Sequence, residues 1–224
     1  MKRIKLVGLT VFAILALSAL GTASAIAEPG FLPKQASANV LGGKYTIATV
    51  GGGLSLACAK LDASTITMTT DEHGSGTLSL LECKAAGLFT LNSLGDKAGV
   101  VLEPVLFLVC LDPKNAEGKL LGEFGFYIEL DKPLHLEIPA LGSLFTISGR
   151  IIGVILSKGK TKLFVVDLAE KPGTPFATSC KQGGETKGAE LAVEENEAKK
   201  TEPASEDAEG LLIQFPNEVE LMDS

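Results

Sequence analysis

The chain has two histidines, and any Ser-His-Asp catalytic triad would have to use one of them. His73 lies between two acidic residues and a Gly-Ser-Gly run, a composition typical of an exposed turn. His135 precedes Glu137 by two residues, so both side chains would share the polar face of a strand. Such a pair suits a base and its orienting group, although a solvated surface histidine has the same pattern. We therefore assign no catalytic residue.

Paired carboxylates are the other chemistry open to this composition, because glycoside hydrolysis needs only two of them, about 5–10 Å apart. Acidic residues in the central part of the chain that could supply such a pair are Glu82, Glu103, Glu123, Glu129 and Glu137. Sugar clefts commonly use aromatic side chains, however, and the chain has no Trp and two Tyr. An extracellular carboxylate-dependent hydrolase is thus the alternative to the function we expect, a non-enzymatic binding domain.

Motifs for metals and cofactors are missing from the sequence. It contains no C-x-x-C, no H-E-x-x-H and no EF-hand loop pattern. Gly51-Gly52-Gly53 precedes an expected strand rather than the helix that a phosphate-binding loop requires. We accordingly assign no metal-ligating and no cofactor-binding residue.

Four cysteines lie beyond the N-terminal segment: Cys58, Cys83, Cys110 and Cys180. If the chain is exported, as its N-terminal pattern predicts, an even number of cysteines favours disulfides, and three pairings are possible. We predict Cys58–Cys83 with Cys110–Cys180, because pairing neighbours along the sequence closes the shorter loops. Buried free thiols are the alternative.

The N-terminus has the pattern of a secretory signal peptide. Three basic residues precede the apolar run 6–20, and small residues end at Ala25, which predicts cleavage before Ile26 or Glu28. The run is shorter than the roughly 20 residues that span a bilayer, so we expect no membrane span after its removal. The mature protein would be secreted or held at the cell envelope, with an unknown envelope, glycan or protein partner.

Charge divides the chain unevenly. The formal charge of −7 becomes −10 once Lys2, Arg3 and Lys5 leave with the signal peptide. The last 40 residues carry 12 acidic and 3 basic side chains, so they hold −9 of that charge. Clustered Lys and Arg are what nucleic acids attract, and we therefore expect no nucleic-acid partner.

Alternation of apolar and polar residues predicts a mainly β fold, an antiparallel β-sandwich or a barrel-like domain with an acidic, partly disordered C-terminal segment. Expected strands include 65–69, 104–111, 123–130, 134–138, 150–156 and 161–168, while 77–88 fits a helix as well as a strand. The predicted organisation is a signal peptide at 1–25, a lead-in at 26–43, a disulfide-linked β-domain at 44–184, an acidic linker at 185–210 and returning strands at 211–224.

Four segments, 94–110, 127–129, 133–139 and 149–153, carry a resemblance that covers most of residues 46–180. Together they resemble a group of secreted proteins of unknown function from soil actinobacteria. The resemblance implies export and a mostly-β fold, and it supplies no site residue.

Overall fold

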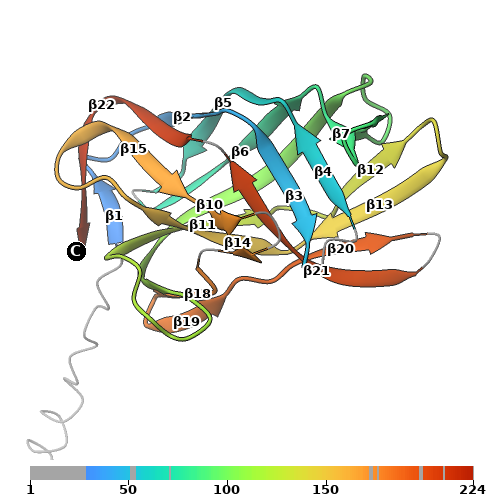
Figure 1. The fold of residues 1–224 in the computed structure, drawn as a ribbon. Coiled ribbons are helices and arrows are strands. Elements are labelled where there is room, and N and C mark those ends of the chain that lie inside the picture. The colour runs from blue at the N-terminus through green and yellow to red at the C-terminus, as the bar shows by residue number, and fades with distance from the viewer. Residues whose placement is uncertain are drawn as a thin grey trace, which may run out of the picture.

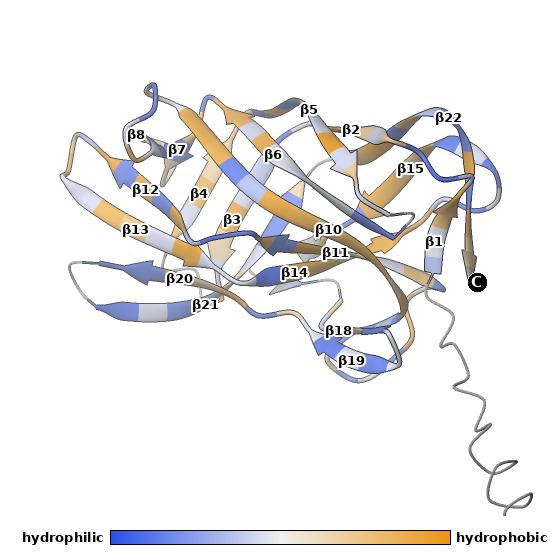
Figure 2. Cartoon of the chain, turned by 180° about the vertical axis from the view of Figure 1, so that it is seen from behind, coloured by the Kyte–Doolittle hydropathy of each residue, from blue (hydrophilic) through white to orange (hydrophobic). Residues whose placement is uncertain are grey.

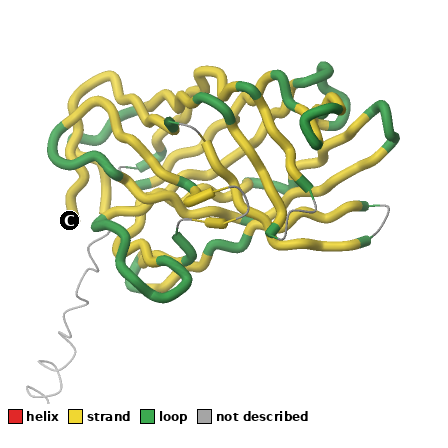
Figure 3. The backbone as a smooth tube through the Cα atoms, in the orientation of Figure 1, coloured by secondary structure: helices red, strands yellow, loops and turns green. Residues whose placement is uncertain are grey.

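The computed structural model describes residues 29–50, 54–70, 72–171, 174–175, 177–196, 199–208 and 210–223. The expected signal peptide, its cleavage sites and the triple glycine at 51–53 lie outside these residues. Regular secondary structure in the described residues consists of strands (Figure 3). None of the described residues forms a helix long and apolar enough to cross a membrane.

Eight antiparallel strands, each paired with the next, form a barrel-like ring (Figure 1). In ring order they are β11 (Phe124–Leu130), β14 (Arg150–Ile155), β15 (Thr161–Asp167), β22 (Leu211–Asp223), β2 (Ser37–Gly42), β5 (Lys60–Met68), β6 (His73–Leu81) and β10 (Val100–Lys114). The ring is closed because the eighth strand, β10, also pairs with the first, β11. Three more strands extend this sheet: β1 (Pro29–Leu32) on β22, β18 (Ser179–Gln182) on β10, and β19 (Glu185–Gly188) on β18.

A second antiparallel sheet continues from the ring. Its strands, in spatial order, are β8 (Phe89–Thr90), β7 (Lys84–Ala85), β4 (Ser55–Cys58), β3 (Tyr45–Thr49), β21 (Lys200–Ala208), β20 (Leu191–Glu195), β13 (Ser143–Ser148), β12 (Leu134–Ile138) and β9 (Asn92–Ser93). A short hairpin of β16 (Ala169–Lys171) and β17 (Thr174–Pro175) completes the described elements.

The chain passes from one sheet to the other through very short connections. Gly43 and Lys44 separate β2 from β3, Ala59 separates β4 from β5, and Gly149 separates β13 from β14. Packed sheets form corners around a shared interior where the chain bends and passes from one sheet to the other. One apolar core therefore runs through both sheets, from Phe164 in the ring to Ile147 in the second sheet.

The predicted period of two is visible in the burial of individual strands. In β12, Leu134, Leu136 and Ile138 are buried while His135 is exposed, and the strand has the bounds that its sequence indicates. The ambiguous segment 77–88 is not a helix: residues 77–81 belong to β6 and 84–85 to β7, with a bend between them and a turn after them, and Leu78 and Leu80 both enter the core from β6. The mainly β, antiparallel and barrel-like fold is thus as expected.

The acidic C-terminal region differs from the expectation. Residues 185–210, predicted to be a linker, supply β19, β20 and β21, and β21 pairs with a strand on each side. Small side chains explain this, since Ala204, Ser205 and Ala208 are buried without requiring large apolar groups. Likewise β2, within the expected lead-in, belongs to the ring. Residues 211–221, for which the sequence predicts a return to a sheet, lie in β22, which pairs with β15 and β2. Figure 2 shows the outer end of the β20–β21 hairpin as largely hydrophilic.

Candidate functional site

A pocket of about 400 Å³ opens where β9 and β12 of the second sheet meet β10 of the ring. We call it the seam pocket. Its lining combines apolar and polar residues: Leu94, Leu102, Pro104, Pro133 and Leu134, with Thr77, Ser93, Asp96, Lys132 and His135. A volume of several hundred Å³ is typical of sites for small molecules.

Backbone contacts hold the seam pocket in shape. The Leu102 amide donates to Ser93 Oγ over 2.9 Å, and the Leu94 amide donates to the His135 carbonyl over 2.9 Å. Residues 93–94 are thereby fixed to β10 and to β12 together. Leu94 is 57% exposed and Leu102 is 37% exposed, so the pocket wall presents two large aliphatic side chains to solvent.

His135 does not pair with Glu137, so the base and orienting group that the spacing left open as one interpretation is not formed, and the surface histidine is the interpretation that fits. Its Nδ1 lies 3.2 Å from Thr146 Oγ1, and that hydroxyl donates to Asn196 Oδ1 over 3.0 Å. Glu137 Oε1 instead accepts a 2.7 Å hydrogen bond from Asn92 Nδ2. The sequence spacing places both side chains on one face, but each forms its hydrogen bond with a residue of a neighbouring strand instead of with the other.

His73 lies at the start of β6 rather than in the exposed turn that the sequence indicates. Its Nε2 is 3.6 Å from Glu72 Oε2 and 3.3 Å from Gln182 Nε2. His73 therefore contacts β18 as well as its sequence neighbour Glu72.

The five expected carboxylates are distributed over different parts of the fold. Glu82 follows β6 and Glu123 precedes β11, whereas Glu129 and Glu137 lie in β11 and β12. Glu103 alone is enclosed in the core, at 1% exposure. Its partner there is Glu206, a residue of the supposed acidic linker.

Tyr45, Glu103 and Glu206 form a buried polar cluster between the two sheets. Glu103 comes from β10 of the ring, while Tyr45 and Glu206 come from the neighbouring strands β3 and β21. The Tyr45 hydroxyl donates to Glu206 Oε2. Glu206 is 2% exposed and Tyr45 1%, so all three side chains are excluded from solvent.

Burial dominates the electrostatics of this cluster. Removal from water raises the pKa of Glu103 well above its usual value, and the adjacent charge of Glu206 raises it further. Burial also raises the pKa of Glu206, against an opposing effect of the Tyr45 hydrogen bond. The pKa of Tyr45 rises well above its ordinary value because the phenol is buried and faces both acids.

A second acidic pair is half-buried. Asp167 ends β15 and Asp207 lies in β21. Burial raises the pKa of Asp167, and the charge of Asp207 contributes to the same shift. An acid with a raised pKa beside a carboxylate is the arrangement that glycoside hydrolysis uses.

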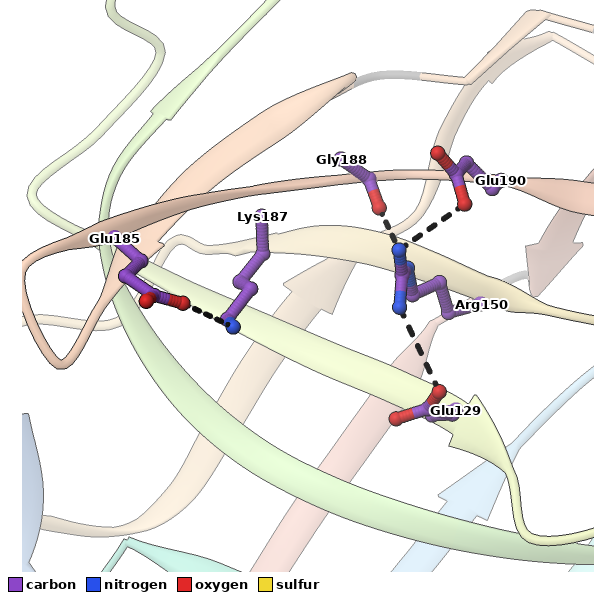
Figure 4. Close-up of polar contacts among 6 residues, drawn as sticks. All are labelled: Glu129, Arg150, Glu185, Lys187, Gly188 and Glu190. Carbon is purple, nitrogen blue, oxygen red and sulfur yellow. Dashed lines mark hydrogen bonds and ion pairs between the residues drawn. The ribbon is translucent and has the colours of Figure 1, made fainter.

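Figure 4 shows the polar contacts of Arg150 beside the separate Glu185–Lys187 ion pair. Arg150 Nε donates to the Gly188 carbonyl over 2.9 Å and its Nη2 to Glu190 Oε2 over 3.0 Å, while Nη1 lies 3.7 Å from Glu129 Oε1. The guanidinium also stands over the Tyr127 ring, 5.8 Å from its centroid. These contacts fix the segment between β19 and β20 against β11 and β14, so we assign Arg150 a structural role.

Both predicted disulfides are confirmed. Cys58–Cys83 joins the end of β4 to the residue before β7, and Cys110–Cys180 joins β10 to β18. Among the described residues, no cysteine is free and no group of three or more His, Cys, Asp or Glu is placed to hold a metal ion.

Sequence reasoning missed Tyr45 and Glu206 because neither belongs to a motif. The available signal was the alternation of Ala204, Glu206 and Ala208, which places an acid between two small residues on one strand face. This alternation is hard to recognise because the surrounding region is rich in acidic residues, a composition typical of a solvated linker.

The chain matches no family model, no curated protein and no solved structure.

Proposed function

We propose that this chain is a secreted or cell-surface binding domain without enzymatic activity, and that the seam pocket receives the aliphatic part of an envelope component. The exposure of Leu94 and Leu102 in the pocket wall carries the proposal. Fully burying an exposed leucine side chain contributes about 1.5–3 kcal/mol, and a ligand that covers the exposed 57% of Leu94 and 37% of Leu102 gains the corresponding part of that free energy. Export is part of the proposal, supported by the N-terminal sequence and by two disulfides, which persist in oxidising compartments.

The lining favours an acyl chain over a sugar. Its apolar residues are Leu and Pro, without the aromatic rings on which sugars commonly stack. Lys132 and His135 also line the pocket and would suit an anionic head group, although Asp96 limits the net positive charge there. An envelope lipid is therefore the ligand class we favour.

Titration calorimetry tests this with decanoate as the acyl probe and a soluble wall polysaccharide as the glycan probe. We expect decanoate to bind, and Leu94→Ser to weaken it about tenfold or more through the lost apolar contact. Leu163→Ser is the matched control, because Leu163 is a similarly exposed leucine on β15 outside the pocket. If decanoate does not bind, or if both variants behave alike, the seam pocket is not the site. Binding of the polysaccharide alone would indicate a glycan-binding domain instead.

A carboxylate-dependent hydrolase is the alternative, and Asp167 with Asp207 is the observation that favours it. This alternative would be established if the wild type hydrolyses a nitrophenyl glycoside and the Asp167→Asn variant does not. The Glu103–Glu206 pair is a poorer candidate because both acids are enclosed by the core.

A further inference from the structure

Two carboxyl groups on different sheets meet in the core, without a basic partner among the residues that the structure describes. Glu103 projects from β10 opposite Leu78 of β6, so apolar residues surround it within its own sheet. Glu206 lies between Ala204 and Ala208 on the facing strand. The titratable groups that act on the two acids are each other and Tyr45, and no Lys, Arg or His of the described residues contributes.

The hydrogen bonds of the cluster are incomplete for ionised acids. Tyr45 supplies one donor, to Glu206 Oε2. Glu206 Oε1 and both oxygens of Glu103 accept no hydrogen bond of good geometry from the described residues. A buried carboxylate without a donor or a cation is costly, whereas a protonated carboxyl supplies its own donor and carries no charge. Two adjacent acids that share a proton form a hydrogen bond with each other and carry one negative charge fewer than two carboxylates, so their burial costs less free energy.

We propose that Glu103 and Glu206 hold a shared proton in the core and form an acid-stabilised contact between the two sheets, which weakens as the surrounding solution becomes alkaline. This contact differs in place and chemistry from the seam pocket. It would make the cohesion of the two sheets depend on the pH outside the cell.

The direction of the effect is opposite to that of a salt-bridged acid. The pKa of each acid is raised in the folded protein above its unfolded value, near 4.3 for glutamate. The folded state therefore retains a proton that the unfolded state releases. The resulting stabilisation is complete below the unfolded pKa and is lost as the pH rises towards the folded pKa.

Urea unfolding of the whole protein at pH 4 to 9 tests the proposal. We compare it with Glu103→Gln and with the double variant Glu103→Gln/Glu206→Gln, which keeps the shape of the side chains and removes the titration. The ratio of the wild-type unfolding constant to that of the double variant should rise with pH, by up to about tenfold per pH unit for one proton. Glu123→Gln is the control, because this exposed glutamate shows the effect of a surface charge and should follow the wild type.

Parallel pH dependence of the wild type and the double variant would overturn the proposal. Should the variants fail to fold, the infrared spectrum of the wild type decides. A protonated carboxyl band that persists at neutral pH is expected, and its absence would equally refute a shared proton.

Discussion

At the scale of single residues, Gly149 and Arg150 determine where the chain turns from the second sheet into the ring. Gly149 has φ of +109°, and a Cβ at this position would lie 1.8 Å from the Glu190 carbonyl oxygen. The next residue exchanges backbone hydrogen bonds with Glu190 and also binds its carboxylate. The close approach of two backbones therefore requires glycine here, and the guanidinium then fixes the passing segment.

Replacing Gly149 by Ala should destabilise the protein by about 3 kcal/mol or more, because a clash with backbone adds to an unfavourable φ. Gly142→Ala is the matched control. It also has a positive φ, of +68°, but nothing lies within 4 Å of the added Cβ, so the expected loss is about 1–2 kcal/mol. Urea unfolding measures both. Equal losses would show that the 149–190 approach relaxes freely.

Arg150→Lys should also weaken the contacts at this turn. A lysine carries one point charge and cannot reach Gly188 and Glu190 with the fixed geometry of a guanidinium. The expected loss of unfolding free energy is about 1 kcal/mol, since the Arg150 side chain is partly exposed. Decanoate binding should be unchanged, because Arg150 does not line the seam pocket. A large change in binding would instead indicate that the Arg150 cluster takes part in recognition.

At the scale of elements, β21 is the strand whose composition is most misleading. Lys200–Ala208 contains three acidic residues and only small apolar ones, yet it pairs with β20 and with β3. We expect a glutamyl-specific protease to leave the bonds after Glu202 and Glu206 intact in the native protein and to cut both in denaturant. Mass measurement over a time course checks this. Native cleavage after Glu206 at the denatured rate would restore the linker hypothesis.

Strands with regular alternation could be predicted, and β12 is the plainest case because two prolines limit it. The pairing of strands could not. Whether β2 lies beside β22, 175 residues away at the Asn39–Gln214 pair, depends on packing of the whole core rather than on local pattern. The contact between Glu103 and Glu206 could not be predicted for the same reason, since the two residues belong to strands of different sheets. The disulfide pairing was predictable because short loops close more readily.

At the scale of the whole molecule, the two disulfides act on different kinds of junction. Cys58–Cys83 joins segments that also pair through β4 and β7, next to a hydrogen bond from the Ala59 amide to the Leu81 carbonyl. Cys110–Cys180 joins β10 to the β18–β19 hairpin, which pairs with the ring through few and irregular positions. This second bridge also closes the longer loop and lies in the small apolar cluster outside the ring.

Removal of Cys110–Cys180 by double alanine substitution should therefore cost more than removal of Cys58–Cys83. The chain-entropy model gives about 4.4 against about 3.5 kcal/mol, and release of the β18–β19 hairpin adds to the first value. For a protein of this size, a loss of that order lowers the melting temperature by roughly 10 °C or more. Thermal unfolding of both double variants provides the comparison, with the fully reduced wild type as the reference for losing both bridges. If the Cys58–Cys83 variant melts lower, the local strand pairing around that bridge contributes less than the structure indicates, and the bend between the two sheets depends mainly on its disulfide.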